Sequence, residues 1–128
     1  MTTQEENLHL LMRHAGLAPE LANESLGGTV VGMLRPYSGL DAAVLGEALN
    51  AARSLSESNL DVQTLLQASL AVCELVSVTR AWGLDRDSML VRNKLIDDAQ
   101  WVALSEWTRE LEEVNKLLLE RGLKGHPS

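Results

Sequence analysis

The chain has 128 residues, with eighteen acidic side chains against eleven basic ones and a formal net charge of −7. This charge, together with only three Trp, one Tyr and no Phe, disfavours binding to nucleic acid and to anionic lipid surfaces, and among proteins it favours a basic partner. A chain of this length fits one domain, which we place at residues 1–122, followed by a frayed tail at 123–128.

The cysteine content and the N-terminal sequence bear on the cellular compartment. Cys73 is the only cysteine, so no internal disulfide can form and an oxidising compartment is not implied. The N-terminal sequence MTTQEENL is acidic where a secretion signal would be basic. We therefore expect a cytoplasmic protein.

Capping residues predict a short first helix. Thr2 or Thr3, followed three residues later by a glutamate, forms a capping-box pattern, and Gly16 marks the end of the helix. The apolar residues in between recur on one face only, so we expect this helix on the outside of the fold. His9 and His14 point in different directions, and we expect both to be ordinary surface or boundary histidines.

Weaker signals follow in residues 19–39. Pro19 suits the first turn of a second helix. Residues 29–34, TVVGML, fit either a strand or a buried helix, and we favour a helix because a lone strand would have no partner. Pro36 places residues 35–39 in a loop.

Residues 61–82, DVQTLLQASLAVCELVSVTRAW, are the stretch around which we expect the fold to be arranged. Apolar side chains surround this helix on nearly every side and leave only a narrow polar row that contains Gln63, Gln67 and Glu74. A helix of this kind has to be covered by protein on almost every side. The same three polar residues argue against a membrane span, so the pattern predicts a buried central helix without membrane contact.

The ends of this helix and its neighbour are also predicted. Asp61 complements the positive end of the helix dipole, and Gly83 is typical of a left-handed helix stop. Residues 41–55 form the cleanest amphipathic helix of the chain. We expect that helix to pair antiparallel with residues 61–82 across the short connection at 56–60.

The long C-terminal region, residues 85–121, contains neither Gly nor Pro, so it forms either one long helix or two helices joined without a breaker. Asp97 followed by Gln100 is a capping pattern, and we place a kink or a split near residues 96–98. The last helix is expected to end at Gly122. The predicted fold is therefore all-α, a compact bundle of five or six helices around the buried central helix.

No complete catalytic, nucleotide-binding or metal-binding motif is present in the sequence. Gly27, Gly28 and Gly32 have the outer spacing of a phosphate loop, but Met33 and Leu34 stand where a lysine and a hydroxyl are needed. The paired aspartates of the chain lack the glycine turn and the terminal glutamate of a calcium loop. We therefore expect no cofactor and no metal, and we favour a protein without enzymatic activity while keeping an enzyme as an alternative.

A heptad-like row along the last helix, together with a further tryptophan, is the predicted interface, because exposed tryptophan is a favoured anchor. The candidate residues are Trp101, Trp107, Leu111, Val114 and Leu118. The leading hypothesis is a non-enzymatic helical module for protein–protein interaction. Such a module would be an adaptor, a regulator or an immunity-type inhibitor that forms a homodimer or binds a basic protein.

The alternative hypothesis is a small helical sensor or enzyme with an apolar pocket between its helices. The candidate pocket residues are Leu65, Cys73, Glu74 and Trp82. A cavity of several hundred Å³ with a convergent polar group would favour the pocket, whereas a densely filled interior would favour the interaction module.

Overall fold

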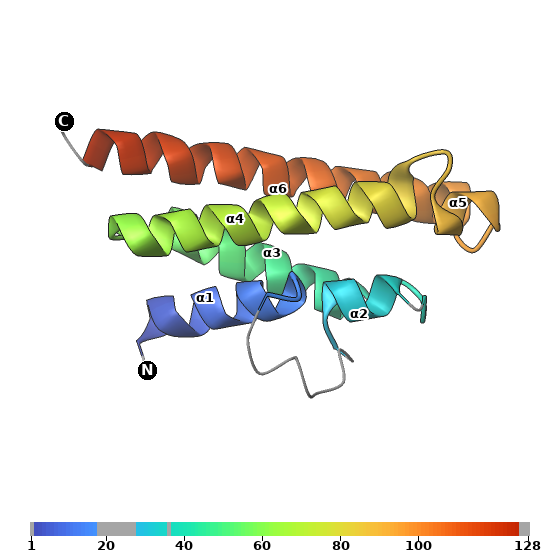
Figure 1. The fold of residues 1–128 in the computed structure, drawn as a ribbon, viewed down its shortest axis with the longest axis horizontal. Coiled ribbons are helices and arrows are strands. Elements are labelled where there is room, and N and C mark those ends of the chain that lie inside the picture. The colour runs from blue at the N-terminus through green and yellow to red at the C-terminus, as the bar shows by residue number, and fades with distance from the viewer. Residues whose placement is uncertain (1, 18–27, 36, 126–128) are drawn as a thin grey trace.

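The computed structural model describes residues 2–17, 28–35 and 37–125 of the chain. The elements in chain order are α1 (Thr3–His14), α2 (Val30–Leu34), α3 (Ala42–Ser56), α4 (Val62–Thr79), the π-helical turn η2 (Arg80–Leu84), α5 (Met89–Arg92) and α6 (Asp98–Gly125). The described ranges contain no strand, and the predicted all-α class is confirmed. Figure 1 shows the helices lying roughly along one common direction.

The four longer helices form a ring. α1 packs on α3 and α4, and α6 packs on the same two helices, so the order around the ring is α1, α3, α6, α4. Figure 1 shows that α1 and α4 run in one direction while α3 and α6 run in the other. α3 and α4 are therefore antiparallel as predicted, but α3 packs chiefly on α1 and α6 rather than on α4.

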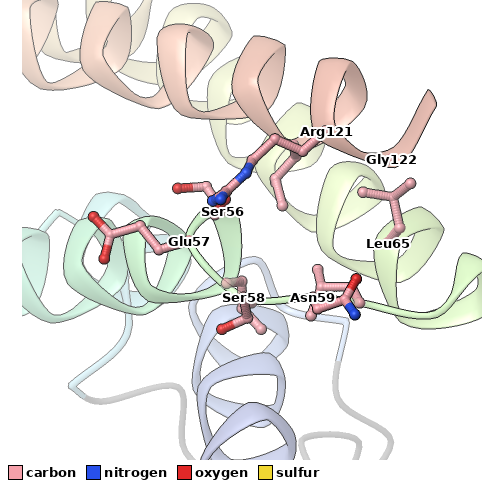
Figure 2. Close-up of a pocket in the computed structure, with 10 residues that line it drawn as sticks. Ser56, Glu57, Ser58, Asn59, Leu65, Arg121 and Gly122 are labelled. Atoms are coloured by element: carbon pink, nitrogen blue, oxygen red, sulfur yellow. The ribbon is translucent and has the colours of Figure 1, made fainter. Parts of the chain in front are cut away.

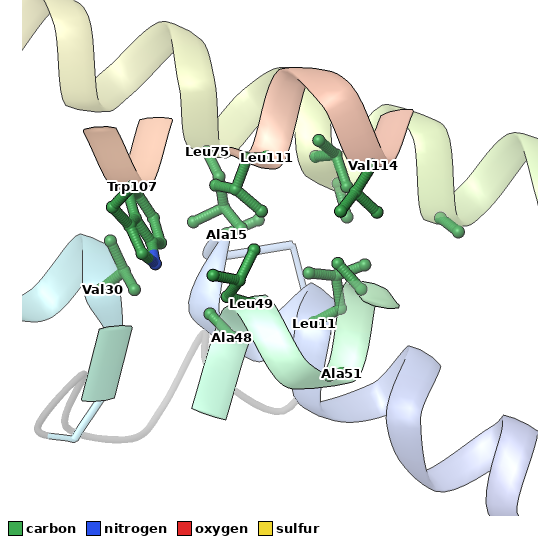
Figure 3. Close-up of a cluster of buried hydrophobic side chains, with 14 of the residues drawn as sticks. Leu11, Ala15, Val30, Ala48, Leu49, Ala51, Leu75, Trp107, Leu111 and Val114 are labelled. Carbon is green, nitrogen blue, oxygen red and sulfur yellow. The ribbon is translucent and has the colours of Figure 1, made fainter. Parts of the chain in front are cut away.

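Side chains from all four helices fill the centre of the ring. Leu11 of α1, Leu49 of α3, Leu75 of α4 and Leu111 of α6 belong to one buried apolar cluster, which is drawn in Figure 3. Full burial of a leucine side chain contributes roughly 1.5–3 kcal/mol. Trp107 also enters this cluster, and its indole N–H donates to the carbonyl oxygen of Leu45 at 2.8 Å, so its one polar atom is satisfied.

Both ends of α1 follow the sequence prediction. The Thr2 hydroxyl accepts from the Glu5 amide at 3.1 Å, and the Glu5 carboxylate accepts from the Thr2 amide at 3.1 Å, which completes the capping box. Gly16 ends the helix with a φ of 72°, in the left-handed region that favours glycine.

The expectation that His14 is a surface or boundary histidine is wrong, because its side chain is 1% exposed. Its Nδ1 accepts from the amide of Val30, at the start of α2, at 3.2 Å. Its Nε2 lies 2.8 Å from a carboxylate oxygen of Glu47 on α3. Because Nδ1 is an acceptor, the neutral ring carries its proton on Nε2 and donates it to Glu47. His14 therefore joins three helices from inside the core, whereas His9 is exposed.

The helical interpretation of residues 29–34 is confirmed by α2, whose first turn is capped by the Thr29 hydroxyl accepting from the Gly32 amide at 3.0 Å. Residues 37–39 are not helical, which agrees with the predicted loop. The predicted helix start at Pro19 and the predicted loop proline Pro36 lie outside the described residues.

The prediction that α4 is buried all round is wrong. α4 occupies one corner of the ring, so only one of its faces reaches the core. Leu66 is 60% exposed and Leu70 is 61% exposed. Cys73, which the sequence placed on a buried wall, is exposed as well. The hydrophobicity of this helix therefore exceeds what the bundle buries.

Gly83 does not act as a left-handed helix stop, because the chain continues from α4 through the π-helical turn η2, and Gly83 does not have a positive φ. It is buried, and a Cβ atom added to it would lie 3.0 Å from a methyl group of Leu104 and 3.4 Å from one of Leu90. A side chain at position 83 would therefore press against the leucines that pack between the end of α4 and the start of α6.

The predicted split in the C-terminal region is confirmed. The carboxylate of Asp97 accepts from the Gln100 amide at 2.7 Å, and the Gln100 side chain accepts from the Asp97 amide at 2.8 Å. α5 ends at Arg92 and α6 begins at Asp98, with Lys94 in a left-handed conformation between them.

Gly122 does not end the last helix, since α6 continues to Gly125. Residues 123–125, predicted as part of a frayed tail, are therefore helical, and 126–128 lie outside the described residues. A Cβ atom added to Gly122 would lie 2.0 Å from a methyl group of Leu65. The glycine therefore permits close contact between α6 and the first turns of α4 instead of breaking the helix.

Candidate functional site

Four of the five predicted interface residues lie in the protein's own core. Trp107, Leu111, Val114 and Leu118 are each at most 6% exposed. They fill the inner face of α6, so the heptad-like row packs on α3 and α4 of the same chain. Trp101 alone remains at the surface, 40% exposed, with its indole N–H donating to the carbonyl oxygen of Leu84 at 3.0 Å.

The predicted pocket residues do not come together. Leu65 lines a pocket beside the connection between α3 and α4, whereas Cys73 lines a different groove between α4 and α6. Trp82 lies beneath the guanidinium group of Arg35, 5.3 Å from the ring centre, and Glu74 is half-buried on the polar edge of α4. These residues therefore occupy separate parts of the bundle.

The pocket beside the connection between α3 and α4 has a volume of about 280 Å³, and Figure 2 shows the side chains around it. Arg121 on α6 donates to the carbonyl oxygen of Ser56, at the negative end of α3. The Ser58 hydroxyl donates to the carbonyl oxygen of Ser54 at 2.8 Å. Both polar groups thus complete the end of α3, and we assign this pocket a structural role in holding α6 to the connection.

The outer surface of α4 and the neighbouring edge of α6 form an apolar surface that the sequence did not predict. We call it the α4–α6 face and define it by Val62, Leu66, Leu70, Cys73 and Leu119, all exposed. The spacing of three and four residues along α4 places its members on one side of the helix. Exposed apolar side chains gathered in this way mark binding surfaces more often than scattered single ones do.

A groove of about 460 Å³ runs between the two helices beside this face. Its lining residues are Val72, Cys73, Val76, Ser77, Glu112, Asn115, Lys116 and Leu119. Asn115 connects the helices across it, accepting from the Ser69 hydroxyl at 2.8 Å and donating to the Cys73 sulfur at 3.6 Å. Arg80 pairs with Glu112 at one end of the groove. The groove therefore has an apolar floor, with charge only at its rim.

His14 and Tyr37, whose pKa values are shifted, both lie away from this face. Burial lowers the pKa of His14, while the hydrogen bond that the ring donates to Glu47 acts in the opposite direction. Burial likewise raises the pKa of the Tyr37 hydroxyl. Among the described residues, no group of three or more His, Cys, Asp or Glu side chains is arranged to hold a metal ion. The α4–α6 face itself is made of apolar side chains and the Cys73 thiol.

One described stretch, Val62–Arg92, is long and apolar enough to pass a length-and-composition test for a membrane span. The sequence-based argument that Gln63, Gln67 and Glu74 make it too polar is therefore not supported by this test. The core helix of a soluble protein passes the same test. Here the inner face of α4, which includes Leu75, is packed within the ring.

No protein-family model matches this chain, and no curated protein or solved structure is significantly similar to it. The signal that could have identified the α4–α6 face was present in the sequence. Alanines at 68 and 71 form part of the inner side of α4, while the bulkier Leu66 and Leu70 fall on the opposite side.

Proposed function

We propose that this protein is a non-enzymatic helical module for protein–protein interaction and that the α4–α6 face is its binding surface. The observation that supports this most strongly is the exposure of Leu66 and Leu70, at 60% and 61%, in the middle of a helix whose other side is fully packed. Full burial of a leucine side chain contributes roughly 1.5–3 kcal/mol, and each of these two leucines forgoes part of that free energy. A partner that covers them recovers this free energy.

The shape of the surface suits a helical partner. α4 and α6 are antiparallel neighbours, and the groove between them has an apolar floor contributed by Val72 and Val76. An amphipathic helix laid into such a groove buries residues spaced three and four apart. Cys73 and Leu119 stand beside the groove and would widen the contact.

Charge supports a second feature of the proposal, a preference for basic proteins when the partner is a different chain. The formal net charge is −7, and the face itself is flanked by carboxylates such as Glu74 and Glu112. Charges of this kind accelerate the encounter with a basic protein more than they strengthen the final complex. An adaptor or an inhibitor of a basic protein would use the surface in this way.

Site-specific photo-crosslinking tests the proposal. A benzoylphenylalanine residue replaces Leu66, and in a matched control it replaces Leu117, which is 48% exposed on the side of α6 that borders α3. Illumination in cell extract is expected to yield a discrete protein adduct from position 66 at least five times more abundant than any adduct from position 117. Equal or absent adducts at the two positions would refute the proposed function.

A further inference from the structure

We infer that the α4–α6 face binds a second copy of this chain, with α4 packed antiparallel on α4 of the other copy around a two-fold axis. This inference rests on the proposed function, because it names the partner for the same face. A two-fold interface requires one surface that is complementary to itself. The outer side of α4 has this property in its pattern of large and small side chains.

Two rows of exposed residues make up that pattern. The first half of α4 exposes the large side chains Val62, Leu66 and Leu70, each four residues apart. The second half, continued into η2, exposes small side chains at the same spacing: Cys73, Ser77 and Ala81. Rows of residues four apart form the ridges that interlock when helices pack. The large row and the small row thus form two ridges with matching spacing.

An antiparallel pair related by a two-fold axis brings the two rows together. With the axis midway between positions 70 and 73, Leu70 faces Cys73 of the second copy and Leu66 faces its Ser77. Val62 then faces Ala81. Every large side chain meets a small one, and each contact occurs twice by symmetry. This arrangement is the knob-and-hole complementarity that a packed helix pair needs.

Charge does not oppose this contact even though each chain is acidic. None of the six positions in the two rows is charged, and the sequence from Val62 to Cys73 contains no charged residue. The charged groups nearest the contact are Asp61, Glu74, Arg80, Glu112 and Lys116. In the proposed register Arg80 falls opposite Gln63 of the second copy, and Glu74 falls opposite its Ser69. Like charges therefore do not meet, and the antiparallel helix dipoles attract.

The contact is small compared with a standard stable interface. The 18 residues of α4 at about 1.5 Å per residue give a strip roughly 27 Å long and about 10 Å wide. This is well below the roughly 800 Å² per partner of a standard stable interface. We therefore expect a weak, reversible dimer rather than a permanent one.

Analytical ultracentrifugation of the purified chain across about 1–500 µM tests the inference. The wild type is expected to shift from monomer to dimer, and Leu70→Glu is expected to raise the Kd at least ten-fold. The matched control Leu117→Glu, on another face, is expected to leave the Kd within two-fold. Far-UV circular dichroism shows whether each variant is folded. The inference would be overturned if the wild type stayed monomeric at every concentration, or if the two variants changed the dimer Kd equally.

Disulfide cross-linking tests the register. In the proposed register, Leu70→Cys places a thiol opposite Cys73 of the second copy. Leu66→Cys instead places a thiol opposite Ser77, where the second copy has no thiol nearby. With copper phenanthroline as oxidant, two thiols lose two electrons and two protons and form one disulfide. Leu70→Cys is expected to yield covalent dimer at least five times faster than Leu66→Cys. Equal rates, or a faster Leu66→Cys, would contradict the register.

Failure of this inference can be distinguished from failure of the proposed function. A purified chain that stays monomeric while position 66 cross-links to a different protein overturns self-association and leaves the interaction module standing. Added salt also distinguishes self-association from binding to a basic protein. Screening leaves the contact between two copies unchanged or strengthens it, whereas it weakens a contact with a basic protein. Leu70-dependent flotation of monomer with phosphatidylcholine vesicles would identify a bilayer as the occupant and would also overturn the inference.

Discussion

α4 and α6 lie side by side and antiparallel, yet they divide their surfaces in different ways (Figure 1). α6 buries one apolar row that includes Leu111 and exposes mainly charged side chains such as Glu113 and Lys116 along its middle. α4 buries Leu75 and its neighbours and exposes a second apolar row around Leu70. Apolar content therefore identifies the buried face of a helix only when the other face is charged.

The largest expected effect separates the two faces of α4. Leu75→Ala, on the inner face, should lower the free energy of unfolding by about 2–5 kcal/mol, because it leaves a cavity in the core. Leu70→Ala, on the outer face, should change it by no more than about 0.5 kcal/mol in dilute monomer. Urea unfolding followed by circular dichroism measures both. Similar losses would mean that both faces of α4 are covered within one chain.

A second test sharpens the comparison where α6 contacts the inner face of α4. Gly122→Ala should destabilise the fold by about 1–3 kcal/mol, because the new methyl group would lie 2.0 Å from Leu65 and the leucine would have to move. Gly46→Ala is the control, since a Cβ there meets nothing within 4 Å in the middle of α3. The control should gain about 0.5–1 kcal/mol from helix propensity. A neutral Gly122→Ala would show that the two helices do not pack this closely.

The third test concerns the side of the ring formed by α1 and α3, where His14 is buried. Burial lowers its pKa, and protonation of Nδ1 would remove the acceptor for the Val30 amide. Below about pH 6.5 the unfolded chain binds a proton that the folded chain excludes, so stability falls as the pH drops from about 6.5 through the lower folded pKa. Above pH 6.5 this contribution is constant.

Urea midpoints at pH 7.5 and pH 5.5 measure this effect. His14→Gln should reduce the pH dependence, because glutamine does not titrate, and His9→Gln on the exposed face of α1 is the control that should preserve it. Equal pH dependence in wild type and His14→Gln would refute the role assigned to the buried ring.

Features encoded by neighbouring residues could be predicted from the sequence. The cap at Thr2 and the split at Asp97 each depend on a hydrogen bond between residues three apart, and the inner row of α6 depends on spacing along one helix. Features that depend on distant contacts could not. His14 contacts residues 16 and 33 positions away, and Gly83 is fixed by Leu104. Nothing local distinguishes such a histidine or glycine from an ordinary one.

The exposed apolar side of α4 was not predicted, for a related reason. The sequence showed that α4 is apolar on nearly every side but not how many helices would be available to cover it. A ring of four helices covers one side of each member, so the surplus apolar side of α4 is left at the surface. The heptad-like row on α6 was assigned to a partner when it serves the chain's own core, because internal and external helix contacts use the same spacing.

The exposure of the outer side of α4 is tested most directly by the rate at which the Cys73 thiol reacts with iodoacetamide in native protein. At a protein concentration of about 1 µM, we expect Cys73 to react at a rate within ten-fold of that in the urea-unfolded chain. At higher protein concentration we expect a slower rate, because the second copy covers the thiol. A thiol that is protected at every dilution until the protein unfolds would show that α4 is enclosed by its own chain, and would contradict the account.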